Sequence, residues 1–182
     1  MWKFAPLVAA LAITLSACNY HVVGDSTMWQ IEQVNGGHGS TQGGCGYTEE
    51  ASCRIAFTPP EGDIVIAGVS VWDSQSTDFS GYREAHEYYA SFGVPVVWVE
   101  VPQMFVPRSG GRSTTALVRL NEGVAEELGC ELQPWTWRDP GVHENGDTGT
   151  IDGIHYTDLG AETVAFNFSH LTAADACVAS VD

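Results

Sequence analysis

The chain has 182 residues, 44% of them hydrophobic, which is enough to bury the core of one ordinary domain but too few for two. This apolar fraction excludes an intrinsically disordered chain. The sequence has 23 acidic residues against 7 lysines and arginines, so its formal net charge is −16 at pH 7. Such a charge repels phosphate backbones and anionic lipids, which argues against nucleic-acid binding.

The first eighteen residues are typical of a targeting segment that precedes the folded domain. "MWKFAPLVAALAITLSAC" has an early lysine, an apolar run too short to span a membrane stably, and small residues before Cys18. Its end, "LSAC", resembles the lipobox of bacterial lipoproteins, in which the cysteine is lipidated. Simple signal-peptide cleavage near Ala17 is the alternative. We therefore expect export, as a cell-envelope lipoprotein tethered through Cys18 or as a secreted or periplasmic protein, with residues 19–182 as one domain.

Strand and helix patterns alternate from residue 19 onward. Residues 19–23, "NYHVV", are apolar and β-branched and predict a strand, whereas residues 28–34, "MWQIEQV", have apolar residues at helical spacing. The glycine-rich tract 35–53 has no helical period, and neither it nor "CRIAF" (53–57) predicts a convincing second strand. The continuous apolar run "DIVIAGVSV" (63–71) predicts a strand that is buried on both faces.

The second half of the sequence predicts three further helices and two further strands. The helices are expected over 79–93, over 113–129 and after residue 157, and the strands over 94–102 and 131–137. Gly93 and Gly129 end the first two helices, and Ser113 is the expected N-cap of the second. Either Thr157 or Asp158 caps the last helix.

This alternation, with apolar strands, predicts an α/β domain with a mainly parallel sheet. In such sheets, ligands bind beyond the carboxyl ends of the strands. Ser26, in "HVVGDSTMW" (21–29), directly follows the first predicted strand. Two interpretations stay open for it: a cap for the helix that follows, or a nucleophile at the edge of the sheet.

A nucleophilic serine needs a base to take its proton, usually a histidine that is oriented by a carboxylate. His155 lies in "TIDGIHYTDLGAE", with Asp152 three residues before it. On a loop or short turn, this spacing lets the carboxylate reach the ring nitrogen that does not face the serine. The structural alternatives are a hydrogen-bonded histidine and a turn aspartate before Gly153.

The two motifs together resemble a known family. "GDST" near the N-terminus and "DGIHYTDLGAE" near the C-terminus are similar to the first and last blocks of the SGNH (GDSL-type) hydrolases. Between them, "GGCGY" (43–47), "DIVIAGVSVWD" (63–73) and "GVPVVWVEVP" (93–102) resemble the bacterial SGNH domains associated with acyltransferases. The resemblance covers residues 20–170 and implies a three-layer α/β fold with a flavodoxin-like, doubly wound, mainly parallel sheet.

The resemblance also implies catalytic roles. Ser26 would be the nucleophile, His155 the general base and Asp152 its orienting partner, with no metal or organic cofactor. Family members bind the oxyanion with the backbone N–H of the serine, a glycine of a second block and an asparagine of a third. The third block normally reads Gly-x-Asn-Asp, whereas this chain has "GVSVWD", in which only Ser70 offers a side-chain donor.

Further site residues follow from the same blocks. Gly44 is the expected second-block oxyanion donor, with Gly39 and Gly46 as alternatives. The expected pocket residues are Asp25, Trp72 and Asp73. Tryptophan faces suit sugar rings, so Trp72 weakly indicates a carbohydrate substrate.

Four cysteines remain once Cys18 is set aside, an even number that fits an oxidising compartment. They are Cys45, Cys53, Cys130 and Cys177. Three disulfide pairings are open, of which the local one joins the first to the second and the third to the fourth. A zinc site is disfavoured because no two cysteines have C-x-x-C spacing, so we expect no metal.

The sequence therefore predicts an exported serine esterase that cleaves, rather than transfers, short O-acyl groups on a carbohydrate or related ester. Hydrolysis is favoured because no acyltransferase domain is attached, and the domain is expected to be monomeric. The alternative from another class is a non-catalytic, glycan-binding surface lipoprotein that retains the SGNH fold, which the missing asparagine favours. A structural envelope protein is a third hypothesis that explains none of the motifs.

Overall fold

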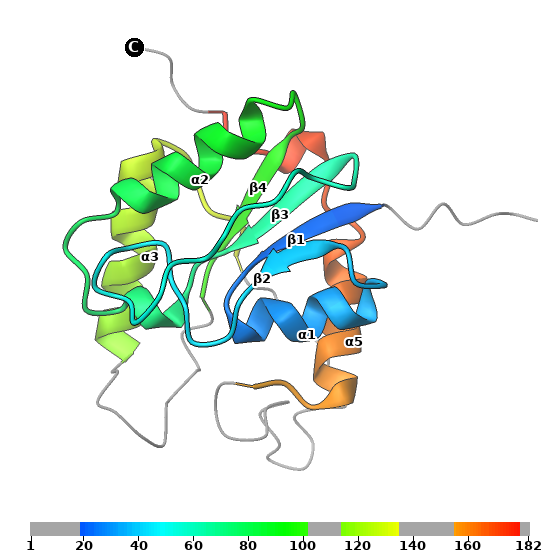
Figure 1. The fold of residues 1–182 in the computed structure, drawn as a ribbon, viewed down its shortest axis with the longest axis horizontal. Helices are drawn as coiled ribbons and strands as arrows, with labels where there is room; N and C mark the ends of the chain where they lie inside the picture. The colour runs from blue at the N-terminus through cyan, green and yellow to red at the C-terminus, as the bar shows by residue number, and fades with distance from the viewer. Residues whose placement is uncertain (1–18, 102–113, 135–154, 179–182) are drawn as a thin grey trace, which may run out of the picture.

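The computed structural model describes residues 19–101, 114–134 and 155–178. They form a parallel sheet with helices on both sides (Figure 1). The strands are β1 (Tyr20–Gly24), β2 (Gly39–Thr41), β3 (Ile64–Gly68) and β4 (Val96–Val99). The helices are α1 (Ser26–Val34), α2 (Ser80–Ala90), α3 (Thr114–Leu128) and α5 (Asp158–Phe168), with short 3-10 turns η1 (Val71–Asp73) and η2 (Ala173–Asp175).

The strand order is β2-β1-β3-β4, and every pairing is parallel. All residues of β1, β3 and β4 are buried, as their continuous apolar runs predict. Of the strand predicted over 131–137, residues 131–134 lie within the described part of the chain, and there Gln133 alone forms an isolated parallel bridge, with Val99 of β4. Residues 135–137 lie outside the described residues. This order is doubly wound, with its switch point between β1 and β3.

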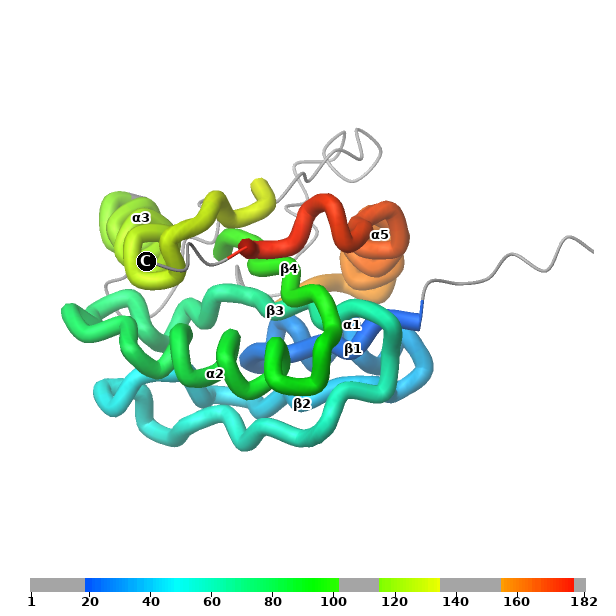
Figure 2. Tube along the Cα trace, turned by 90° about the horizontal axis from the view of Figure 1, so that it is seen from above, coloured from blue at the N-terminus to red at the C-terminus, as the bar shows by residue number. Residues whose placement is uncertain are grey.

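Two pairs of helices cover the sheet. Helix α1 packs against α5, and α2 packs against α3. Figures 1 and 2 show the α2–α3 pair on one side of the sheet and the α1–α5 pair on the other. The three-layer, flavodoxin-like α/β architecture expected from the sequence is therefore confirmed.

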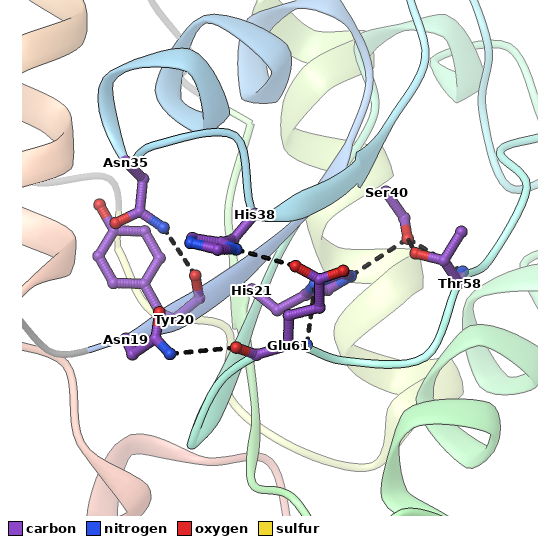
Figure 3. Close-up of polar contacts among 8 residues, drawn as sticks. All are labelled: Asn19, Tyr20, His21, Asn35, His38, Ser40, Thr58 and Glu61. Atoms are coloured by element: carbon purple, nitrogen blue, oxygen red, sulfur yellow. Dashed lines mark hydrogen bonds and ion pairs between the residues drawn. The ribbon is translucent and has the colours of Figure 1, made fainter.

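Strand β2 is the element that the sequence did not predict. It is the polar segment Gly-Ser-Thr, and its place beside β1 depends on contacts from elsewhere in the chain. The Ser40 hydroxyl lies 3.1 Å from Nε2 of the buried His21, and the backbone N–H of Thr58 donates to it at 3.0 Å (Figure 3). Thr41 is held by a hydrogen bond to Glu32 on α1. These contacts compensate for the apolar side chains that β2 lacks.

Most helix ends agree with the predicted signals. Thr157 is the N-cap of α5, where its Oγ1 accepts the Gly160 N–H at 3.1 Å. Gly129 follows α3 with φ +67°, a conformation that glycine adopts readily. Helix α1 begins two residues before the predicted segment, because Asp25 caps it. The expected cap Ser113 lies outside the described residues.

Two disulfides join Cys45 to Cys53 and Cys130 to Cys177, which is the local pairing. They are compatible with an extracellular protein. Cys18 and the rest of the expected targeting segment lie outside the described residues. No helix in the described part of the chain is long and apolar enough to cross a membrane.

Candidate active site

The candidate site begins at the turn between β1 and α1, beyond the carboxyl end of the first strand. Gly24 ends β1, and a Cβ added to it would lie 2.4 Å from Cγ of Met28, so only glycine lets α1 fold back this closely. Asp25 then caps α1 by accepting the Thr27 backbone N–H at 2.9 Å. Ser26 is thereby fixed as the first residue of the helix, half-buried at the edge of the sheet.

The structure brings Ser26 and His155 together, although 129 positions separate them in the sequence. His155 Nε2 lies 3.0 Å from Ser26 Oγ, a hydrogen-bonding distance that suits proton transfer. His155 is half-buried and stands three residues before α5, which packs against the helix that Ser26 begins. Asp152 lies outside the described residues, so its place beside His155 stays a prediction.

The segment directly before the first disulfide loop, residues 43–44, lies close to Ser26. A Cβ added to Gly43 would lie 3.6 Å from the Ser26 Cβ. Within the described residues, the backbone N–H groups of Ser26 and Gly44 have no hydrogen-bond partner, as oxyanion donors require. Gly44 has φ +77° with open space around it, and its carbonyl accepts the Ser52 hydroxyl at 2.9 Å.

The two alternative glycines are placed differently. The N–H of Gly46 donates to the Cys53 carbonyl at 3.0 Å. Gly39 lies in β2 opposite Val22, two residues before β1 ends. Of the three glycines weighed as the second oxyanion donor, the geometry favours Gly44, because its N–H has no partner among the described residues and it directly follows Gly43, which lies close to Ser26. Its role stays a prediction.

Ser70 is fully buried at the turn after β3. Its hydroxyl has one proton to share between Asp25 Oδ2 at 3.1 Å and the Cys45 carbonyl at 3.0 Å. It also accepts the Trp72 backbone N–H at 3.2 Å. The hydroxyl is therefore engaged in joining the turn after β1, the turn after β3 and the disulfide loop. An oxyanion role for it would require these contacts to rearrange.

Asp25 and Asp73 lie beneath the site rather than in its wall, because they are 1% and 0% exposed. Asp25 accepts hydrogen bonds from Thr27, Ser70 and the Val71 N–H, while its burial raises the pKa of the carboxyl against the effect of those bonds. The geometry therefore favours a structural role for Asp25 and Asp73 over direct contact with a substrate.

Asp73 fixes the disulfide loop from below. It accepts the Tyr47 N–H at 2.9 Å, the Thr48 N–H at 3.3 Å and the Thr48 hydroxyl at 2.6 Å. The Tyr82 hydroxyl also donates to it, at 2.7 Å. Burial, followed by the charge of Asp73, holds the pKa of Tyr82 well above its usual value, so this hydroxyl stays a donor. Trp72, the third expected pocket residue, is half-buried and packs against the core.

Sequence reasoning missed Gln30 and Tyr82. Gln30 lies one helical turn after Ser26, and its amide pairs with the backbone of Tyr156, the residue after His155. The i, i+4 spacing from the candidate nucleophile was the signal available for Gln30. Tyr82 carried no local signal, because its contact with Asp73 follows from how α2 packs. Among residues 19–101, 114–134 and 155–178, no group of three or more His, Cys, Asp or Glu side chains could hold a metal ion.

No family model matches the sequence, and no curated protein matches it significantly. Among solved structures, a GDSL-like lipase from Bacteroides thetaiotaomicron VPI-5482 is similar, with a TM-score of 0.53 at 15% identity over 82% of this chain and 86% of the lipase. This chain has the SGNH hydrolase fold. An acetyl xylan esterase also matches, with a TM-score of 0.44 at 12% identity over 82% of this chain and 97% of the esterase.

Proposed function

We propose that the protein is an exported serine esterase of the SGNH type, which removes short O-acyl groups from a carbohydrate or related ester. The observation that carries this proposal is the distance of 3.0 Å between Ser26 Oγ and His155 Nε2. The pair lies beyond the carboxyl end of β1, beside the switch point of the sheet, where doubly wound domains bind their ligands.

In the proposed reaction, Ser26 Oγ attacks the ester carbonyl carbon while His155 Nε2 takes the hydroxyl proton. The carbonyl π electrons move to the oxygen, which accepts hydrogen bonds from the backbone N–H groups of Ser26 and Gly44. Asp152 holds the histidine tautomer and stabilises the imidazolium. When the carbonyl re-forms, the bond to the alcohol oxygen breaks and His155 returns the proton to that oxygen. Water then attacks the acyl-serine by the same route and releases the carboxylic acid.

Two features of the described residues support an oxyanion at this place. Ser26 is the first residue of α1, so the helix dipole favours negative charge beside it. The two backbone N–H groups assigned as donors have no partner elsewhere in the described ranges. With the Ser70 hydroxyl engaged by Asp25 and Cys45, no third donor is assigned. The loss of one donor typically lowers the rate about 100- to 1000-fold, so a slow enzyme is expected.

The substrate class is the finer part of the proposal. The half-buried Trp72 follows β3 at the same edge of the sheet, and its aromatic ring is the group proposed to contact a sugar ring. Hydrolysis is proposed over transfer to a second alcohol. Turnover of an acetylated sugar with and without an added acceptor alcohol distinguishes the two, because transfer consumes the acceptor and releases less acetate.

The first test measures hydrolysis of 4-nitrophenyl acetate and labelling by a fluorophosphonate for the wild-type protein, Ser26→Ala and His155→Ala. We expect both signals to vanish in Ser26→Ala and to fall by at least about 1000-fold in His155→Ala. Ser91→Ala is the matched control, because this exposed serine lies at the end of α2 and should leave both signals unchanged. A folded wild-type protein that neither labels nor hydrolyses simple esters would refute the esterase and favour glycan binding without turnover.

Export through a lipidated Cys18 is a separate part of the proposal. The full sequence is expressed in bacterial cells, and a Triton X-114 extract of those cells is separated into its two phases. The wild-type protein should partition into the detergent phase, and the Cys18→Ser variant should partition into the aqueous phase. Equal partitioning of the two would instead support simple cleavage near Ala17.

A further inference from the structure

The side chain of Gln30 is paired with the backbone of the segment that carries His155. Gln30 Oε1 accepts the Tyr156 backbone N–H at 2.7 Å, and Gln30 Nε2 donates to the Tyr156 carbonyl at 2.8 Å. One primary amide thus satisfies both backbone groups of one residue, as a neighbouring β-strand would. Both bonds are short and their directions are complementary, so the amide orientation is fixed.

Gln30 and Ser26 lie on the same face of α1, because four residues separate them and α1 is a regular helix over Ser26–Val34. Helix α1 therefore carries the candidate nucleophile at its first residue and, one turn later, forms two hydrogen bonds with the backbone of the segment that contains His155. The distance between Ser26 Oγ and His155 Nε2 is then set by a single rigid element that holds both partners.

The segment is also held on the other side of Tyr156. The Tyr156 side chain is 0% exposed, and Thr157 caps α5 by accepting the Gly160 N–H. These anchors fix the residues after His155, but they reach α1 only through the packing of the two helices. The Gln30 amide is a direct polar link between α1 and the backbone beside the histidine.

We infer that Gln30 is a positioning residue, which holds the His155 imidazole at hydrogen-bonding distance from Ser26 by clamping the Tyr156 backbone. This inference rests on the proposed esterase. Both polar atoms of the Gln30 amide are bonded to the Tyr156 backbone, so the inference gives Gln30 no direct contact with substrate. Its loss acts on the alignment of the serine–histidine pair, so it lowers kcat rather than weakening the binding of a small ester.

Gln30→Met tests the inference, because methionine fills nearly the same space without either hydrogen bond. We expect kcat for 4-nitrophenyl acetate and the rate of fluorophosphonate labelling to fall about 10- to 100-fold, with KM within about twofold of wild type. Gln30→Glu keeps the acceptor for the Tyr156 N–H but sets an anionic oxygen against the carbonyl, so it should lose rate as well. Gln33→Met is the matched control on the exposed face of the same helix and should behave as wild type.

A double-mutant cycle separates positioning from a general effect on the fold. In the His155→Ala background, Gln30→Met should cause no further loss of the residual activity, because there is no imidazole left to place. An equal additional loss in that background would overturn the inference, as would wild-type rates in the single variant.

Amide hydrogen exchange at Tyr156 distinguishes this failure from failure of the proposed function. In the wild-type protein the Tyr156 N–H should be protected, and in Gln30→Met it should exchange at least about tenfold faster. A clamped wild-type protein with no Ser26-dependent turnover would refute the esterase, and the positioning role with it. Turnover that is lost in Ser26→Ala but kept in Gln30→Met would refute the positioning role alone.

Discussion

Removal of the Cys130–Cys177 disulfide should lower stability more, whereas removal of the Cys45–Cys53 disulfide should lower activity more. Cys45 and Cys53 are 8 positions apart and close a short loop that begins directly after Gly44. Cys130 and Cys177 are 47 positions apart, and the Cys177 N–H donates to the carbonyl of Val96, the first residue of β4. The second bridge therefore lies at the amino edge of the sheet, away from Ser26.

The expected stabilities follow from the length of chain that each bridge closes. In the chain-entropy model, the length of the closed loop predicts that Cys45–Cys53 stabilises the folded state by about 2.5 kcal/mol and Cys130–Cys177 by about 4 kcal/mol. The double variant Cys130→Ala/Cys177→Ala should thus be about 1.5 kcal/mol less stable than Cys45→Ala/Cys53→Ala. Urea unfolding followed by circular dichroism measures this difference, with equal m-values as the check that both transitions remain two-state.

The expected activities have the reverse order. Without the Cys45–Cys53 bridge, the segment around Gly44 is held by hydrogen bonds and packing alone. Ser52 donates to the Gly44 carbonyl, Ser70 donates to the Cys45 carbonyl, and the N–H groups of Tyr47 and Thr48 donate to Asp73. Because a partly displaced oxyanion donor loses much of its value, we expect kcat to fall about tenfold or more. Removal of the Cys130–Cys177 bridge should leave kcat within about twofold at a temperature where the variant is folded.

The reasoning is refuted if the more destabilised variant is also the less active one when both are fully folded. Such a result would mean that activity follows global stability, and that the disulfide loop does not hold a group of the site. Wild-type kcat in Cys45→Ala/Cys53→Ala would argue against Gly44 as an oxyanion donor or show that the hydrogen bonds of Ser52, Ser70 and Asp73 fix the segment without the bridge.

Three further predictions concern the groups beneath and behind the site. Asp73→Ala leaves two buried N–H groups and two hydroxyls without their acceptor and should lower the free energy of unfolding by about 3 to 5 kcal/mol, measured in urea; a loss below about 1 kcal/mol would contradict this. Gly46→Ala places a Cβ 2.2 Å from Asp73 Oδ1, so it should lower the free energy of unfolding by well over about 2 kcal/mol. Gly44→Ala, where the positive φ is the only penalty, should lower it by roughly 1 to 2 kcal/mol. Equal losses in the two variants would argue against this packing. Burial lowers the pKa of His21 below 6.5 in the folded protein, so the unfolded chain takes up the proton at a higher pH than the folded one. The free energy of unfolding should therefore fall as the pH drops from about 6.5 toward the lowered pKa, by at most about 1.4 kcal/mol per pH unit. His21→Gln should remove that part of the slope, and an unchanged slope would assign it to other groups.

The sequence predicted the elements whose side chains decide their structure locally. The apolar runs of β1, β3 and β4 could be found because strands buried on both faces need no polar alternation. Strand β2 could not be found, because Gly39–Thr41 is stabilised by hydrogen bonds with His21, Thr58 and Glu32, which lie 9 to 19 positions away on other segments. Figure 3 shows the two of these contacts that Ser40 makes, with His21 and Thr58. Its pairing with β1 is a tertiary contact that overrides a weak strand propensity.

The same division applies to the site. Ser26 and His155 could be singled out because their motifs combine a turn after a strand with a histidine before a helix. The burial of Asp25, Ser70 and Asp73 could not be foreseen, because a sequence does not show whether a polar side chain after a strand points to solvent or joins two turns. The hydrogen bonds that decide this come from segments 25 to 46 positions away.

The placement of Ser70 offers a physical reason for the missing third-block asparagine. An amide side chain that points at an oxyanion leaves the turn after β3 without the contact that Ser70 makes to Asp25 and to the Cys45 carbonyl. These contacts join the turn after β3 to Asp25 and Cys45, the chain neighbours of Ser26 and Gly44. If the N–H groups of Ser26 and Gly44 bind the oxyanion, the site has two donors, and the Ser70 contacts hold the turns that carry them. A rigid frame preserves the value of the remaining donors, because an oxyanion hole stabilises the transition state only as far as it is preorganised. This geometry therefore favours a slow esterase with a well-ordered site over a protein whose site is disordered and inactive.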